Sequence, residues 1–374
     1  MKRILWIAAG VVFVTSIGLR AGGVTYTVPD SDDYVTLAGR AQVQYHMSNP
    51  SEGETTDELL LRRLRATLIG STHPDWLVKM QVDFGKNNTS LVDAYVEYTG
   101  LEAMNVAIGN YNTPFSRESI ASSKKQQLVE RTFVGDHNYG VTDRQLGLHL
   151  YGAVADEKVA WALAATKAAV DPNNSRIDFD TVASLDKGDD WNEGEMACAR
   201  LEFFPLGSFS YDQGDFTRKP RVAVGIAGYA WQNDDDNLEP MRSNDVDTVI
   251  GTEISAAVRG YGCSVDMQYN RIESDLVDEG INDGLYKDSD TTLETWAIEG
   301  GYMILAQKLE AVAGYEEQDA DGFEEIWTRT SVGLNYFIEK QDIKVQVTYR
   351  MGENVDGEPG NDLDELFVQF QYVF

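Results

Sequence analysis

The sequence predicts an all-β protein, a transmembrane antiparallel β-barrel of sixteen strands. Three observations predict this class. Residues 366–374 alternate in polarity and finish on an aromatic residue, the first residues read as an export signal, and alternating segments of about ten residues recur in between. These segments are joined by connections that alternate between short and long, as in barrels with short turns at one rim and long loops at the other.

The last segment shows the pattern most clearly. Leu366, Val368, Phe370, Tyr372 and Phe374 fall on one face, and Gln369 and Gln371 fall on the other. A barrel strand in lipid needs an apolar outer face that ends in an aromatic girdle, while its inner face is wet. We therefore expect this strand to close the barrel against the first strand and to be read by the barrel-assembly machinery.

The N-terminus predicts export. Lys2 and Arg3 precede a mostly apolar run over 4–17, which fits the charged and apolar regions of a cleaved signal peptide over 1–21. A retained N-terminal anchor is the alternative. A short segment over 22–33 and a barrel domain over 34–374 follow, and no later apolar run approaches the roughly 18 residues of a spanning helix.

The strands are expected in order along the chain. The first begins at Tyr34, where Val35, Leu37 and Val43 alternate with Arg40 and Gln42. A helix of this sequence would have no apolar stripe. The others are expected at 58–70, 75–85, 91–99, 103–112, 144–152, 158–167, 195–204, 220–232, 248–258, 262–271, 292–303, 308–317, 325–337, 343–351 and 363–374.

The connections assign the two ends of the barrel. Segments 71–74, 100–102, 153–157, 259–261, 304–307 and 338–342 are short turns, and 113–143, 168–194, 233–247 and 272–291 are long loops. The connection over 205–219 is long for a turn. A soluble β-sandwich would also give short alternating strands. It does not explain the signal, the terminal aromatic residue and the alternation of loop lengths together.

Charge and cysteine content exclude several classes. The formal net charge is −30, so we expect no binding to nucleic acid. Cys198 and Cys263 are the only cysteines. Cys198 has the polar parity of its strand and Cys263 has the apolar parity of a non-adjacent strand, so we expect both thiols to be free.

Several short motifs resemble one family. The chain reads IGNYNTPF over 108–115, LVERTF over 128–133 and DRQLGLHLYG over 143–152, with DAYVEY over 93–98 and FFPLG over 203–207. These segments resemble the phosphate-selective porin O and P family, with its Pro-Phe strand end, its Glu-Arg loop and its Arg-x-x-Gly strand start. One position departs, because Asn112 replaces the basic residue before the Pro-Phe pair.

The resemblance implies a sixteen-stranded outer-membrane barrel, commonly a homotrimer, whose third external loop folds into the lumen. That loop corresponds to 113–143 here. It also implies small anions such as phosphate as the transported solutes, and outer-membrane lipid as the surroundings.

The third loop is the expected site of anion binding. Unlike the acidic loops over 168–194 and 272–291, residues 112–142 carry four basic residues against three acidic ones. Ser123 and Gln126 form a capping-box start, which predicts a short helix that presents Lys124 and Arg131 on one face. A solvated surface helix is the alternative. The candidate anion-binding residues are Arg117, Lys124, Lys125 and Arg131.

The barrel wall supplies a second set of cations. Charges on the lipid face cost about 2–4 kcal/mol at mid-bilayer, so charged side chains of polar parity should point into the lumen. Asp83, Asp93, Glu253 and Glu299 share this inward parity, so some of the charges should pair across the lumen. The candidate pore-wall cations are Arg40, Arg63, Arg65, Lys79, Arg144, Arg329, Lys344 and Arg350.

No enzyme motif is present, because His46, His73, His137 and His149 are scattered and neither an HExxH nor a G-x-S-x-G motif occurs. Weak Ca²⁺ binding by the acidic stretches 234–236 and 318–325 is conceivable from their oxygen content, but solvated loops explain them better. No other cofactor is expected.

The sequence therefore predicts a water-filled channel for passive diffusion of small hydrophilic solutes, biased toward anions such as phosphate. Two alternatives stay open: a general or cation-favouring porin, which the acidic loops favour, and a non-conducting structural or adhesive barrel.

Overall fold

The computed structural model describes residues 23–173, 176–180, 193–233, 246–277, 281, 284–287 and 290–374. The expected signal peptide over 1–21 and the acidic stretch 234–236 lie outside these ranges. Among the described residues, no helix is long and apolar enough to cross a membrane.

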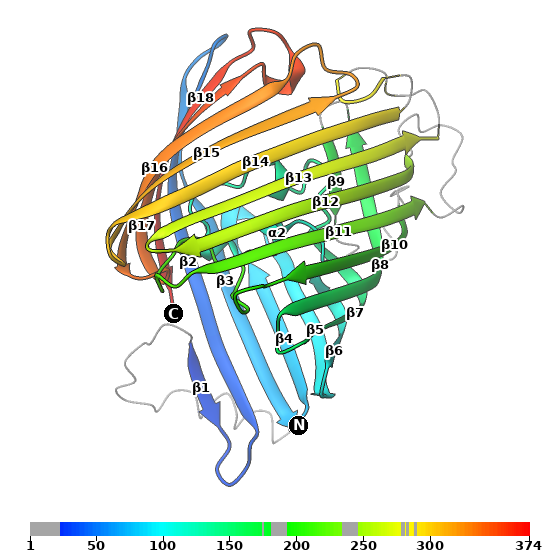
Figure 1. The fold of residues 1–374 in the computed structure, drawn as a ribbon, viewed down its shortest axis with the longest axis vertical. Coiled ribbons are helices and arrows are strands. Elements are labelled where there is room, and N and C mark those ends of the chain that lie inside the picture. Colours follow the sequence, from blue (N-terminus) through cyan, green and yellow to red (C-terminus); the bar gives the residue numbers. More distant parts are fainter. Residues whose placement is uncertain are drawn as a thin grey trace.

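Sixteen strands form a closed antiparallel barrel (Figure 1), which confirms the predicted fold class. Each strand pairs with its neighbours in chain order, and β8 pairs directly with β10. The strands are β2 (Tyr34–Pro50), β3 (Thr56–His73), β4 (Trp76–Asp83), β5 (Ser90–Leu101), β6 (Met104–Asn112), β7 (Arg144–Val154), β8 (Val159–Asn173), β10 (Glu193–Phe203), β11 (Arg221–Asn233), β12 (Val246–Gly260), β13 (Cys263–Leu276), β14 (Asp290–Leu305), β15 (Leu309–Ala320), β16 (Trp327–Glu339), β17 (Ile343–Glu353) and β18 (Leu363–Val373).

The last strand closes the ring against the first. β18 pairs with β2 from Leu363 opposite Pro50 to Val373 opposite Arg40. Phe374 continues the pairing, because its amide donates to the Gly39 carbonyl at 3.0 Å and its carbonyl accepts from the Gly39 amide at 2.9 Å. A Cβ on Gly39 would lie 2.5 Å from the Phe374 ring, so this closure requires glycine at position 39.

The strands alternate between a lipid-type outer face and a polar inner face. On β11, Val224 and Ile226 are exposed on the outside, whereas Ala223 is fully buried. On β2, Gln42 and Gln44 are buried on the inside. This is the pattern of a barrel whose apolar band contacts hydrocarbon.

Two short strands extend the barrel. β1 (Val24–Thr27) pairs with the first residues of β2, and β9 (Arg176–Asp180) pairs with the last residues of β8. The sequence did not predict β9, and it placed the end of β13 five residues too early. Beyond the apolar band, outward charges pair with each other, as in Arg271 with Glu273 at 2.8 Å and Lys167 with Glu195 at 3.3 Å. The strands thus continue beyond the apolar band. There the outward residues are charged, so the alternation of apolar and polar residues no longer indicates a strand.

The barrel has a turn end and a loop end, as the connection lengths predicted. β3–β4, β5–β6, β12–β13 and β16–β17 are joined by tight turns at the turn end. Residues 204–220, between β10 and β11, are the exception at this end and are called the lumen turn below. Residues 113–143, between β6 and β7, are called the lumen loop. Cys198 is buried, Cys263 is exposed and both are free, as predicted.

Candidate functional site: a passage along the basic wall

The lumen loop lies inside the barrel and is held by side chains of the wall. At its base, the Thr113 hydroxyl contacts the Thr142 hydroxyl at 2.6 Å. Further along, the Gln127 carbonyl accepts from Asn335 at 2.9 Å and from Gln346 at 3.0 Å. The loop backbone thus obtains from β16 and β17 the hydrogen bonds that a helix would have provided internally.

This explains why the predicted helix over 123–131 is wrong. Residues Ser123–Lys125 form only a 3-10 turn. The short helix of the loop is α2 (Arg117–Ile120), where the Ser116 hydroxyl accepts from the Ser119 amide at 3.0 Å. The capping-box signal assumes that the following backbone has no better partner. Here the wall supplies one.

An apolar cluster fixes the loop-end part of the lumen loop. Phe133 lies 4.7 Å from Trp327 of β16 and 5.5 Å from Tyr139, measured between ring centres. Phe115 lies 4.7 Å from Tyr229 of β11, and the Tyr229 hydroxyl donates to the Gly140 carbonyl at 2.6 Å. This part of the lumen is therefore filled by side chains, because apolar groups at van der Waals distance leave no room for water.

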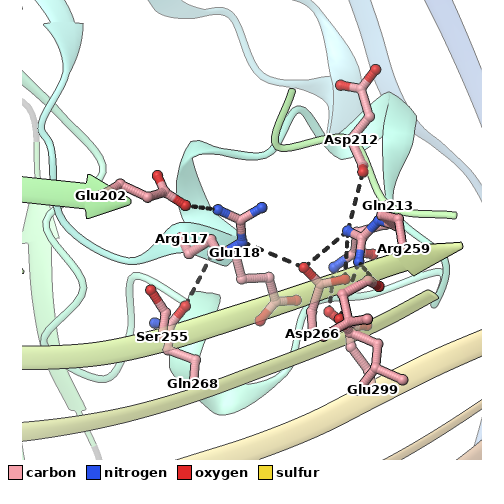
Figure 2. A network of polar contacts seen from close by, with 12 residues as sticks. Arg117, Glu118, Glu202, Asp212, Gln213, Ser255, Arg259, Asp266, Gln268 and Glu299 are labelled. Atoms are coloured by element: carbon pink, nitrogen blue, oxygen red, sulfur yellow. Dashed lines mark hydrogen bonds and ion pairs between the residues drawn. The ribbon is translucent and has the colours of Figure 1, made fainter. Parts of the chain in front are cut away.

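The lumen loop covers the acidic side of the wall. Glu253 of β12 accepts from the Ser116 amide at 2.7 Å, and Glu316 of β15 accepts from the Phe133 amide at 2.6 Å. Arg117 forms ion pairs with Glu202 of β10 and Asp266 of β13. These carboxylates face the loop rather than open space, as Figure 2 shows for Glu202 and Asp266.

A cavity of about 1270 Å³ remains on the other side of the lumen loop. Its lining extends from Gly39 and Phe374 near the turn end to Glu58 and Asp356 near the loop end, so it follows the wall for most of the barrel's length. The wall on this side comes mainly from β2 to β6 and from β16 to β18.

Positive charges predominate in the cavity. Twelve arginines and lysines line it against eight aspartates and glutamates, an excess of four in a chain whose net charge is −30. The basic residues are Arg40, Arg62, Arg63, Arg65, Lys79, Lys86, Lys124, Arg131, Arg144, Arg176, Arg329 and Arg350.

Of the eight predicted wall cations, seven line the cavity. The exception is Lys344, which is fully buried and donates to the Gln126 carbonyl at 3.0 Å and to Gln341 at 2.9 Å. Three others are neutralised by neighbours on the wall, because Arg65 pairs with Asp83 at 2.6 Å and both Lys79 and Arg144 pair with Asp93 at 2.7 Å.

Arg40 and Arg63 differ from these. Arg63 donates to the Gln42 amide oxygen at 3.2 Å, and the Arg40 Nε is buried without a hydrogen-bond partner. Neither forms an ion pair with any residue that the structure describes. The register places Arg40 opposite Arg65, and Gln42 opposite Arg63, on adjacent strands. Two guanidinium groups thus face the cavity with unused hydrogen-bond donors, which suits an anion.

The four predicted loop cations separate into two pairs. Lys124 and Arg131 line the cavity, and Arg131 donates to the Ser119 and Ala121 carbonyls at 2.9 and 3.2 Å. Arg117 lies on the acidic side, as described, and Lys125 pairs with Asp212 of the lumen turn. Arg117 and Lys125 therefore face away from the passage, because carboxylates on the other side of the loop attract them.

The titration of two loop residues reflects this crowding of positive charge. Burial and the nearby charge of Arg40 lower the pKa of Lys124. Burial would raise the pKa of Glu130, but Arg62 outweighs it and holds that pKa well below its ordinary value. In the described part of the chain, no group of three or more His, Cys, Asp or Glu side chains is placed to hold a metal ion.

Comparison with known proteins agrees with this geometry. Residues 35–189 match the model of the family described as phosphate-selective porin O and P. This match covers less than half of the chain and agrees with the family that the sequence resembles. Porin O of Pseudomonas aeruginosa is 29% identical over 118 residues, which cover 29% of this chain and 27% of that porin. An uncharacterized protein of Aquifex aeolicus is 25% identical over 316 residues, 75% of this chain and 66% of that protein. The matches thus span less than two thirds of either relative.

Solved structures of outer-membrane proteins share the fold. An anion-selective porin from Comamonas acidovorans has a TM-score of 0.59 at 10% identity and covers 91% of this chain and 100% of its own. The outer membrane channel DcaP of Acinetobacter baumannii has a TM-score of 0.56 at 13% identity over 93% and 99%. A trimer form of OmpT from Vibrio cholerae has a TM-score of 0.55 at 14% identity over 91% and 99%. At these identities the likeness is one of fold.

Sequence reasoning missed three basic residues of the cavity, Arg62, Lys86 and Arg176. Strict alternation allows only one of Arg62 and Arg63 to point inward. The ladder between β2 and β3 has a register shift, since Gln42 pairs with Arg63 but Val43 pairs with Leu61. Arg62 is the extra residue of this bulge, so both arginines face the cavity.

Proposed function

We propose that this protein is an outer-membrane porin that passes small anions, phosphate among them, along the basic wall of its barrel. The observation that carries the proposal is the cavity itself, with its excess of positive charge and with Arg40 and Arg63 free of ion pairs among the described residues. The family match over residues 35–189 supports it. Because no step requires chemistry, solutes move by electrodiffusion and the charges set the barrier.

The passage favours release as well as entry of an anion. Arg40 and Arg63 offer donors, while Asp83 and Asp93 lie nearby on the same wall and neutralise Arg65, Lys79 and Arg144. A site of modest excess charge replaces part of an anion's hydration without trapping it, which conduction requires. Inorganic phosphate, with several acceptor oxygens, suits the paired guanidinium groups better than chloride does.

We also propose the surroundings of the channel. The apolar outer band fits outer-membrane lipid, with the turn end at the periplasm and β18 as the signal for the barrel-assembly machinery. A homotrimer is the assembly we expect. The predicted alternatives, a cation-favouring porin and a non-conducting barrel, are separable outcomes of the following experiment.

The test is the reversal potential of the purified protein in a planar bilayer under a salt gradient, with inorganic phosphate then titrated against the chloride current. We expect anion preference and block by phosphate, both weakened in Arg63→Gln. Lys219→Gln is the matched control, because Lys219 is exposed on the lumen turn outside the cavity lining. Cation preference that persists in both variants would overturn the proposal, as would the absence of conductance steps.

A further inference from the structure

The lumen turn, residues 204–220, extends into the barrel from the turn end. Most connections at this end are tight, whereas this one places Gln213 and Asp215 at only 2% exposure each. Asp215 fixes the return of the chain, since it accepts from the Arg218 amide and from the Gly262 amide, both at 2.8 Å. The turn is therefore a built element of the lumen.

Gln213 joins the lumen turn directly to the lumen loop. Its backbone amide donates to the Lys125 carbonyl at 3.0 Å, and its side-chain oxygen accepts from the Gln127 amide at 2.7 Å. The neighbouring Asp212 forms an ion pair with Lys125. Two main-chain groups of the loop, one on each side of Gln126, are thus held by a single residue of the turn.

The same part of the turn is anchored to the wall (Figure 2). The Gln213 carbonyl accepts at 3.1 Å from Gln341, which lies in the turn between β16 and β17. The Gln213 side-chain nitrogen donates to Glu299 of β14. Arg259 of β12 donates to the Asp212 carbonyl at 3.2 Å. Gln213 therefore uses both its backbone and side-chain groups to connect the wall, the turn and the loop.

Aromatic residues of the turn complete the contact. The Arg117 guanidinium lies 4.9 Å from the ring centre of Tyr211 and 5.6 Å from that of Phe209. Arg200 of β10 lies 5.7 Å from the Tyr211 ring. Cation–π contacts of this kind are strongest when water is excluded, so they favour a closed arrangement of turn and loop.

What the turn and the loop enclose is the acidic side of the lumen. Glu202, Glu253, Asp266 and Glu299 all lie there and are buried or nearly so, and Arg117 of the loop is one of the cations that neutralise them. If the loop moved away, Arg117 would leave with it. Arg200 and Arg259 of the wall would remain as the ion-pair partners of Glu202, Glu253 and Asp266. Water would then enter beside four acidic residues and only these two basic ones, and such a space attracts cations.

We propose that the lumen turn is a strut that positions the lumen loop and keeps this acid-lined side of the barrel closed, with Gln213 as the positioning residue. This inference rests on the proposed channel function, because in a channel the selectivity between anions and cations depends on which side of the lumen loop conducts. Removing it should open a second passage of opposite charge preference rather than merely widen the first.

The experiment compares single-channel conductance and the anion-to-cation permeability ratio of the wild type, Gln213→Ala and Ser210→Ala in the same bilayer. Ser210 lies on the same turn and is exposed, so it controls for changes to the turn as such. We expect Gln213→Ala to raise conductance by roughly twofold, since both sides of the lumen would conduct, and to shift the ratio toward cations. Ser210→Ala should match the wild type.

Unchanged conductance and ratio in folded Gln213→Ala would overturn the strut, and so would an increase in conductance without a shift toward cations. If Gln213→Ala does not yield a heat-resistant folded band on gels, Lys125→Ala replaces it, because that variant removes only the partly exposed ion pair with Asp212. It should shift the ratio in the same direction by less, and no shift would overturn the strut. Failure of the proposed function appears separately, as cation preference in the wild type.

Discussion

The ion pair between Arg62 and Glu130 offers a quantitative test of the passage. Glu130 of the lumen loop accepts from Arg62 Nε at 2.6 Å and from Arg62 Nη2 at 2.8 Å, and both side chains line the cavity. Glu130→Gln removes one of the eight acidic residues and keeps the shape of the side chain. Arg62→Gln removes one of the twelve basic residues and leaves Glu130 without its partner.

The size of the effect follows from Coulomb's law. A unit charge 4 Å from a passing ion contributes about 1 kcal/mol in a water-like medium, and more where the wall lowers the effective dielectric. This corresponds to roughly a fivefold change in the local anion concentration. The same charge changes the local cation concentration by a similar factor in the opposite direction. We therefore expect Glu130→Gln to raise the anion-to-cation permeability ratio by up to about 25-fold and Arg62→Gln to lower it by a similar factor.

The double variant separates charge from shape. Arg62→Gln with Glu130→Gln loses one charge of each sign, so the excess in the cavity returns to that of the wild type. Reversal potentials should be measured at about 0.1 M salt, where charges act over about 10 Å, and again at about 1 M, where the differences should shrink. A double variant that stays far from the wild type, or Glu130→Gln that favours cations, would refute the electrostatic account of the passage.

Two further predictions concern buried groups. Burial raises the pKa of Glu118 to about 7, above its ordinary value of 4.5. Between these two pH values the folded state holds a proton that the unfolded state has lost, so the free energy of unfolding falls as the pH rises through this range. At pH 8 the free energy of unfolding of Glu118→Gln should therefore exceed that of the wild type by up to about 3 kcal/mol, with a correspondingly higher unfolding temperature. At pH 4 the two proteins should not differ in this way, and equal differences at both pH values would contradict the prediction. In the folded protein a maleimide should label Cys263, which is exposed, and spare Cys198, which is 4% exposed in the apolar cluster; mass spectrometry that finds the adduct on Cys198 would contradict its inward placement.

The barrel could be predicted from the sequence because strand alternation is a local property. Whether Arg40 points inward depends on its own strand, so parity alone placed seven of the eight predicted wall cations around the cavity. Arg62 escaped because a bulge breaks the parity. The sequence does carry a signal for it, since the outward leucines Leu59 and Leu61 are two apart but Leu61 and Leu64 are three apart.

The course of the lumen loop could not be predicted in the same way. Its backbone partners, such as Asn335 and Gln346, lie about two hundred residues away, and no local rule anticipates them. The capping-box signal at Ser123 therefore failed, and Arg117 was assigned to the passage although its carboxylate partners lie across the barrel. The contribution of Gln213 was likewise hidden, because a polar residue in a turn has no distinctive pattern.

The sign of the net charge in such a cavity therefore depends on which wall residues the loops cover, not on the composition of the chain. This chain carries 61 acidic and 31 basic residues, yet its cavity has an excess of positive charge. The inner wall holds both signs, and the lumen loop lies against the carboxylates of β10 to β15 while leaving the arginines of β2 and β3 open. A related barrel with the same wall but a differently placed loop would expose the carboxylates and prefer cations. Selectivity in such barrels should therefore change through substitutions that move the loop, without any change to the charges of the wall.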